Sequence, residues 1–105
     1  MRTPEGSIKL KVKRILFELG AYFVMPSTGG YGSSGAPDFI FCLRGRFMAI
    51  ECKANGNKPT ALQEKNLGAI RHAEGITWVI DETNVDDLRD LIQSEFNTRK
   101  EGLYG

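Results

Sequence analysis

Apolar residues first recur at helical spacing near the start of the chain. The residues of this stripe are Ile8, Val12, Ile15, Leu16 and Leu19. Pro4 and Glu5 suit the first turn of a helix, and Gly20 suits its C-terminal end. The pattern therefore predicts an amphipathic helix from Pro4 to Leu19.

The same spacing returns twice further along the chain. Thr60 and Gln63 have the spacing of a capping box, which predicts a helix over 61–74. Its expected inward residues are Leu62, Leu67, Ile70 and Ala73. A last amphipathic helix is predicted over 85–96, with a frayed tail from Asn97. Its apolar residues are Val85, Leu88, Leu91, Ile92 and Phe96.

Short apolar runs between these helices predict strands. They cover residues 21–25, 38–43, 47–53 and 76–80. The turn Arg44-Gly45-Arg46 makes the second and third runs a β-hairpin. The predicted order is α-β-β-β-α-β-α, so the fold class is α/β, a mixed β-sheet flanked by helices. A length of 105 residues suits one domain, and we expect residues 1–105 to form it.

The predicted hairpin brings charged residues together at its open end. If Leu43 pairs with Arg46, the same register pairs Asp38 with Glu51. Lys53 shares the face of Glu51, because side chains two positions apart on a strand point the same way. Cys52 points to the opposite face. The hairpin thus predicts a cluster of two carboxylates and one ammonium.

Two adjacent carboxylates repel each other unless a cation lies between them, and their oxygens suit Mg²⁺ or Mn²⁺. Asp38, Glu51 and Lys53 therefore have the chemistry of phosphodiester hydrolysis. Glu5 falls on the inward stripe of the first helix, three residues before Ile8, so it either caps the helix or points into the site. The alternative is a surface salt-bridge cluster, but the apolar neighbours of these strands favour burial, where unpaired acids are costly.

Charge and cysteine content refine the picture. The net charge is +1, but residues 1–75 hold eleven Lys and Arg against six Asp and Glu, whereas residues 76–105 hold three against seven. A basic body is compatible with a polyanion such as DNA, although charges also decorate ordinary solvated faces. Cys42 and Cys52, without a signal peptide or an apolar run long enough to span a membrane, predict reduced thiols and an intracellular, cytoplasmic location.

Candidate DNA contacts follow from position. Lys9 and Lys13 lie on the polar side of the first helix, where a solvated face is the alternative, and Lys58 lies just beyond the third predicted strand. Tyr31 belongs to a Gly- and Ser-rich loop over 26–36 that is long enough to suggest a function. The loop lacks the GK[ST] of a P-loop, and no helix follows it as in a dinucleotide fingerprint.

The motifs resemble a known family. PEGSIKLKVKRILFELGAY, GAPDFIF, GRFMAIECK and KPTALQEKNL together resemble the VRR-NUC (virus-type replication-repair nuclease) family, within the PD-(D/E)xK superfamily. The resemblance covers nearly the full length and implies a restriction-endonuclease-like core. Stand-alone viral members are small homodimers that resemble Holliday-junction resolvases.

The resemblance also implies roles for individual residues. Asp38 and Glu51 would be metal ligands, and the backbone carbonyl of Cys52 would complete the coordination. Lys53 would orient or deprotonate the attacking water. Glu5 would hold the outer shell of the metal through water, and Gln63 would lie near the site.

We therefore expect a Mg²⁺- or Mn²⁺-dependent DNA endonuclease, cutting four-way junctions as a homodimer. A flap, nonspecific or restriction-type nuclease is the first alternative. A structure-specific DNA-binding module without turnover is the second.

Overall fold

The computed structural model describes residues 3–26 and 35–104, with side chains up to residue 97. The elements, in chain order, are α1 (Pro4–Leu19), β1 (Tyr22–Val24), β2 (Phe39–Leu43), β3 (Arg46–Cys52), α2 (Ala61–His72), β4 (Ile76–Ile80), the 3-10 turn η1 (Val85–Asp87) and α3 (Leu88–Tyr104). This order confirms the predicted α/β class.

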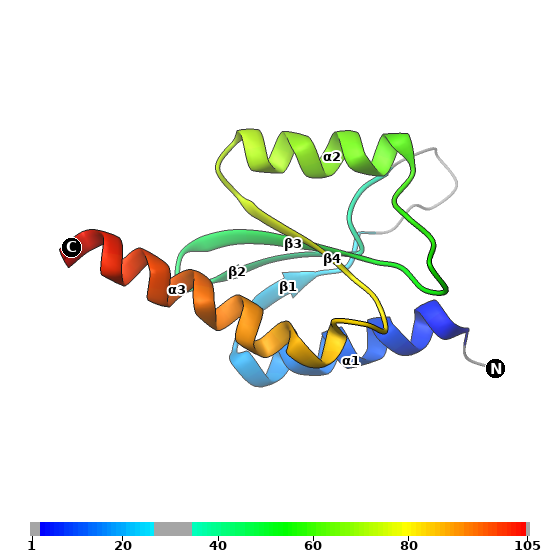
Figure 1. Ribbon diagram of the computed structural model, residues 1–105, viewed down its shortest axis with the longest axis horizontal. Coiled ribbons are helices and arrows are strands. Elements are labelled where there is room, and N and C mark those ends of the chain that lie inside the picture. Colours follow the sequence, from blue (N-terminus) through cyan, green and yellow to red (C-terminus); the bar gives the residue numbers. More distant parts are fainter. Residues whose placement is uncertain (1–2, 27–34, 105) are drawn as a thin grey trace.

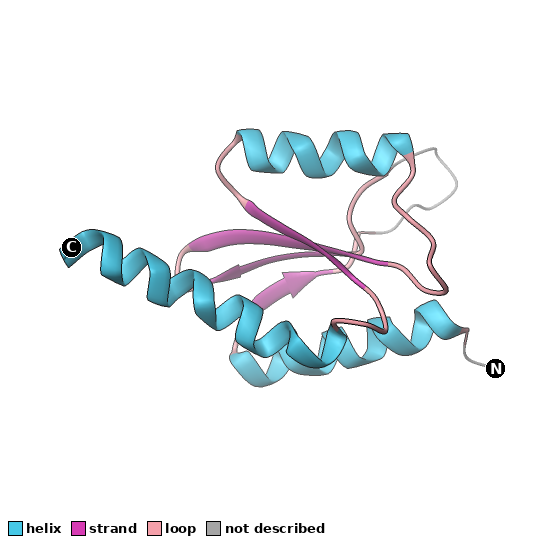
Figure 2. Ribbon diagram, in the orientation of Figure 1, coloured by secondary structure: helices cyan, strands magenta, loops and turns pink. Residues whose placement is uncertain are grey.

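The four strands form one mixed sheet in the order β1-β2-β3-β4. β2 pairs antiparallel with both β1 and β3, whereas β4 runs parallel to β3. α1 and α3 cover one face of the sheet and α2 lies over the other (Figure 1, Figure 2). The helix α2 supplies the crossover that a parallel β3–β4 pair requires.

The main core lies between the sheet and the pair α1 and α3. Phe39 pairs with Ile50 and Phe41 with Met48, so these four side chains share one face and are buried. Helices α1 and α3 bury apolar residues against that face, among them Leu16 and, from α3, Leu88 and Ile92. The opposite face of β3 is thereby left for α2 and for charged side chains.

Local signals account for the ends of α1. The Thr3 side chain accepts a hydrogen bond from Gly6 N, and Gly20 closes the helix with a φ of 80°. Arg44 and Gly45 both have positive φ, 51° and 81°, as the two central residues of a type I′ hairpin turn require. The predicted bounds of α1 and the predicted hairpin register are therefore correct, with Leu43 opposite Arg46.

Two predictions on the helices need correction. α2 ends at His72, and Ala73 and Leu62 are exposed rather than inward, Leu62 by 48%. At Leu62 the side chain lies against the segment that enters β2: a Cβ added at Gly35 would lie 2.7 Å from Leu62 Cγ. Leu62 therefore packs against that segment instead of the sheet.

The last helix differs at both ends from the expected 85–96. Its first three residues form the 3-10 turn, where Val85 N donates to Asp81 O. The α-helix then continues to Tyr104 instead of fraying from Asn97. No glycine or proline interrupts the chain from Leu88 to Glu101, so the helical hydrogen bonds continue past the last core contact.

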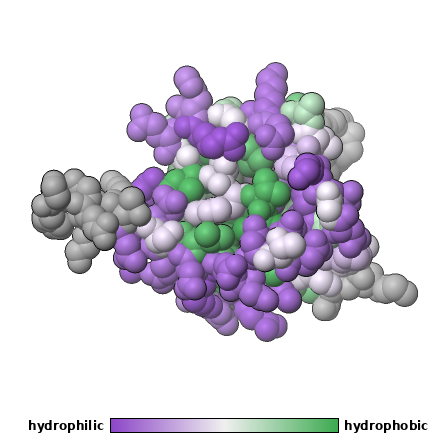
Figure 3. Space-filling view, in the orientation of Figure 1, coloured by the Kyte–Doolittle hydropathy of each residue, from purple (hydrophilic) through white to green (hydrophobic). Residues whose placement is uncertain are grey.

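β4 forms one edge of the sheet. Its residues from Ile76 to Val79 are only half-buried. On the face seen in Figure 3, apolar side chains gather between α2 and α3 and are surrounded by hydrophilic ones. This face of the molecule thus has an apolar centre and a hydrophilic rim (Figure 3). Among the described residues, no helix is long and apolar enough to cross a membrane.

The packing of α1 yields a stability prediction. Leu16 is fully buried, whereas Leu10 on the same helix is 45% exposed. We expect Leu16→Ala to lower the free energy of unfolding by about 2–5 kcal/mol, because it leaves a cavity in the core. Leu10→Ala should change it by only about 0.5 kcal/mol. Urea denaturation followed by circular dichroism measures both, and equal effects would contradict the assigned inward face.

Candidate active site

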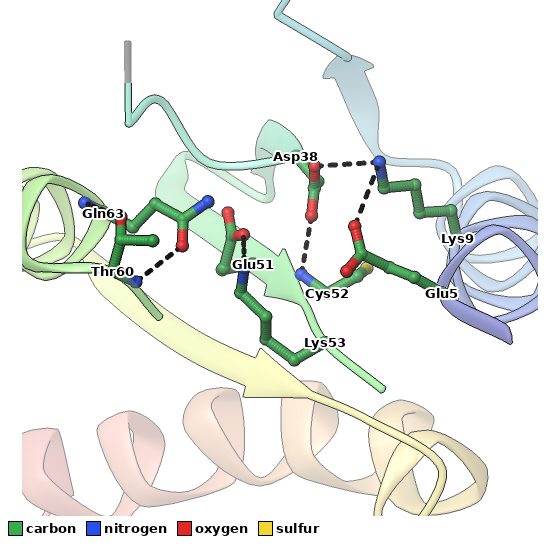
Figure 4. A network of polar contacts seen from close by, with 8 residues as sticks. All are labelled: Glu5, Lys9, Asp38, Glu51, Cys52, Lys53, Thr60 and Gln63. Atoms are coloured by element: carbon green, nitrogen blue, oxygen red, sulfur yellow. Dashed lines mark hydrogen bonds and ion pairs between the residues drawn. The ribbon is translucent and has the colours of Figure 1, made fainter. Parts of the chain in front are cut away.

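The predicted charged cluster lies where β2 begins and β3 ends, beside the first turns of α1 (Figure 4). Asp38 directly precedes β2, and Glu51 lies in β3. Because Phe39 pairs with Ile50, Asp38 and Glu51 are the next residues outward in the same register. Glu51 lies on the face of β3 opposite the main core, since its neighbours Ile50 and Cys52 both face that core.

Glu51 is the buried charge of the cluster. It is 2% exposed, and its Oε2 lies 3.4 Å from the Nζ of Lys53. Its Oε1 is buried and has no hydrogen-bond partner among the described residues. Burial, followed by the nearby negative charge of Asp38, raises the pKa of Glu51 to about 7, and Lys53 offsets part of this rise. An unpaired buried carboxylate oxygen is destabilising, so its presence needs a reason beyond folding.

Asp38 connects the two strands of the hairpin. Its Oδ2 accepts a hydrogen bond from the backbone N–H of Cys52 at 2.8 Å. Its Oδ1 lies 3.3 Å from the Nζ of Lys9. The carboxylate is therefore held in orientation by one backbone group of β3 and one side chain of α1.

Lys9 and Glu5 bring α1 into the cluster. The Nζ of Lys9 lies 3.5 Å from Oε2 of Glu5, one helical turn earlier, while it also contacts Asp38. Burial lowers the pKa of Lys9, but the carboxylates of Asp38 and Glu5 outweigh this effect and leave it raised. The sequence placed Lys9 only on the polar side of the helix, as a DNA contact. The i,i+4 spacing from Glu5 was the one signal for half of this bridge.

The two faces of Cys52 have different surroundings. Its side chain is fully buried in the core, and burial raises the pKa of the thiol well above its usual range. The thiol therefore stays protonated and faces away from the carboxylates, as the strand alternation predicts. Within residue 52, only the backbone is placed to serve the cluster.

Gln63 approaches the cluster from α2, on the face of the sheet opposite α1 (Figure 1). The predicted capping box is present: Thr60 N donates to Gln63 Oε1 at 2.8 Å, and Gln63 N donates to Thr60 Oγ1 at 3.2 Å. In Figure 4 the amide of Gln63 points toward Glu51. Since its oxygen is engaged by the cap, the amide NH₂ is the group that it presents to Glu51.

The remaining predicted residues lie outside these contacts. Lys13 and Lys58 are exposed, and neither forms an ion pair with a described residue. Tyr31 lies outside the described residues. The charged contacts of the site therefore come from five side chains: Glu5, Lys9, Asp38, Glu51 and Lys53.

The donors of the site suit a hard divalent cation. Within residues 3–26 and 35–97, no three His, Cys, Asp or Glu side chains are grouped closely enough to enclose a metal. Mg²⁺ does not need such a cage, because it is commonly held by one or two carboxylates and keeps several waters. The free Oε1 of Glu51 and the nearby carboxylate of Asp38 supply two carboxylates of this kind.

The raised pKa of Glu51 gives a prediction for the metal-free protein. A folded pKa of about 7 exceeds the ordinary value of 4.5, so the native state binds this proton more tightly than the unfolded state. The contribution of protonated Glu51 to the free energy of unfolding is thus fully present below pH 4.5 and is lost as the pH rises to about 7. We expect Glu51→Gln to stabilise the protein at pH 8 by about 1–3 kcal/mol, since the neutral amide mimics the protonated acid. Glu64→Gln, an exposed change on α2, is the matched control.

Urea denaturation at pH 5 and pH 8 in EDTA measures the effect. The gain from Glu51→Gln should shrink at pH 5, and the control should show no such dependence. A destabilised Glu51→Gln protein at pH 8 would contradict the prediction.

Comparison with known proteins agrees with this geometry. No protein-family model matches the sequence, and no curated protein matches it. Among solved structures, the chain is similar to a VRR-NUC domain, with a TM-score of 0.69 and 28% sequence identity. The match covers 84% of this chain and 96% of that chain. The resemblance carried by the sequence motifs is therefore confirmed by a structural likeness to a VRR-NUC domain.

Proposed function

We propose that this chain is a divalent-metal-dependent DNA endonuclease that hydrolyses phosphodiester bonds at the cluster of Asp38, Glu51 and Lys53. One observation carries the proposal: Glu51 is 2% exposed, and its Oε1 has no partner among the described residues. Folding alone gains nothing from this arrangement. A cation that binds the free oxygen together with Asp38 would explain it.

Mg²⁺ or Mn²⁺ would be held by Asp38, Glu51 and the backbone carbonyl of Cys52, with Glu5 contributing through water. When bound, such an ion supplies Lewis-acid stabilisation of charge on phosphoryl oxygens. Asp38 is prepared for this role because the Cys52 N–H fixes one of its oxygens. The backbone thereby limits the conformational freedom that the carboxylate would lose on binding.

Lys53 is proposed to act on the reacting groups. Its side chain is 12% exposed and its ammonium is held beside Glu51, so the ammonium lies at the cluster without being free in solvent. From there it would orient the attacking water or take its proton, and it would offset negative charge on the phosphate. The amide of Gln63 would donate a hydrogen bond at the same site from α2.

Nuclease assays test the assignment directly. We expect Asp38→Asn and Lys53→Met each to reduce cleavage of DNA in Mg²⁺ or Mn²⁺ by about 100-fold or more, because each removes a group that acts on the transition state. Lys65→Met, at an exposed position on α2, should cleave normally. Circular dichroism would show that the variants are folded. Full activity in both site variants would overturn the assignment.

The proposed substrate is a four-way junction cut by a homodimer. Symmetric cleavage of a junction needs two active sites related by a two-fold axis, and one chain of this size offers one site. The half-buried apolar residues of the edge strand β4 give a second copy apolar area to cover. The exposed cations Lys13 and Lys58 would meet phosphates, and Tyr31 is a further proposed contact. The unpaired thiols of Cys42 and Cys52 suit the reducing cytoplasm of a cell.

Substrate choice and oligomeric state can be measured together. We expect faster cleavage of a synthetic four-way junction than of a flap or a linear duplex at equal concentration, and a dimer in sedimentation equilibrium. Preference for the flap or for plain duplex would instead support a flap, nonspecific or restriction-type nuclease. Junction binding in EDTA with no product in any metal would support a DNA-binding module without turnover.

A further inference from the structure

The site contains two lysine–carboxylate pairs that differ in exposure. Lys53 pairs with Glu51, and their side chains are 12% and 2% exposed. Lys9 pairs with Asp38 and Glu5, and these side chains are 35%, 19% and 38% exposed. The first pair is thus enclosed by the protein, whereas the second lies at the rim of the site.

The ammonium of Lys9 contacts carboxylates that a metal would bind. This ammonium lies 3.3 Å from Asp38 Oδ1, which is the oxygen of Asp38 that the backbone does not engage. It also lies 3.5 Å from Glu5. A dication bound to Asp38 and an ammonium at this distance would repel each other, because like charges in a partly desolvated site interact strongly.

Only one of the two lysines can leave at low cost. Lys9 has a long flexible stem, and more than a third of its side chain already faces solvent, so its ammonium can rotate into water. The side chain of Lys53 is only 12% exposed, so its ammonium has no comparable route into water. The exchangeable cation of the site is therefore Lys9.

We propose that Lys9 competes with the divalent metal for Asp38 and Glu5. In the metal-free protein its ammonium neutralises these carboxylates and joins α1 to the start of β2. Metal binding displaces the ammonium from Asp38 into solvent, and this leaves a free cation at the rim of the site. Lys9 is thus a positioning residue that lowers metal affinity and stabilises the metal-free fold. The inference rests on the proposed metal site.

The test measures metal binding without any nuclease assay. Lys9→Met removes the charge and keeps most of the stem. Lys11→Met is the matched control, because Lys11 is exposed on the same helix and forms no ion pair with a described residue. Each full-length protein is freed of metal with EDTA and dialysed, and Mn²⁺ binding is then followed by electron paramagnetic resonance of the free ion and by calorimetry.

We expect Lys9→Met to bind Mn²⁺ about fivefold more tightly than wild type, the size expected for giving up an exposed ion pair. Lys9→Arg should bind as wild type does, and so should Lys11→Met. Thermal unfolding supplies a second readout: Lys9→Met should melt about 2–5 °C lower without metal and match wild type at saturating Mn²⁺.

Equal or weaker Mn²⁺ binding by Lys9→Met would overturn the competition, even if its melting temperature falls, because a merely structural lysine would have that effect alone. If neither wild type nor Lys9→Met binds Mn²⁺, the metal site itself is wrong and the inference fails with it. The two failures are therefore distinguishable.

Discussion

The charged site depends on a carboxylate that the sheet buries without fully satisfying it. Glu51 is buried because β3 is an inner strand, paired with β2 on one side and β4 on the other. The neighbours of Glu51 along β3, Ile50 and Cys52, are committed to the main core, so the alternation of the strand fixes the direction of its side chain. The fold thus keeps a raised-pKa acid at a place that α2 covers, and every other charge in the site is arranged around it.

Compensation of that acid comes from separate elements. Lys53 is two residues further along the chain, and Asp38 comes from the start of β2. Asp38 in turn is held by the Cys52 N–H and by Lys9 of α1. Lys9 contacts both Asp38 and Glu5, and the charge of Asp38 raises the pKa of Glu51, so the site behaves as one network rather than as separate pairs.

The network also changes how the net charge of +1 is understood. Six of the acids lie in residues 1–75, and three of them, Glu5, Asp38 and Glu51, belong to the site. The other seven lie beyond residue 75. Lys9 and Lys53 are engaged inside the cluster, so the cations available to a polyanion are the exposed ones, such as Lys13 and Lys58. A near-neutral total is therefore compatible with a local surface that attracts DNA.

Local patterns determined much of the fold. The stripe of α1, its cap at Gly20, the hairpin turn at Gly45 and the capping box at Thr60 are all short-range signals, and the sequence predicts each of them correctly. The hairpin register also follows from a local turn, which is why Asp38 and Glu51 could be placed at one end of it. The exposure of Leu62 could not be found this way, since it depends on what packs nearby.

The partners of the charged groups were decided by tertiary structure. Sequence alone identified Asp38, Glu51 and Lys53 as a cluster, but it gave Lys9 no place in it, because the contact with Asp38 spans 29 positions and depends on how α1 packs on the sheet. The unpartnered Oε1 of Glu51 is likewise a property of packing. Periodicity and turn chemistry act over a few residues and so determine the elements, whereas burial and charge compensation arise only when those elements meet.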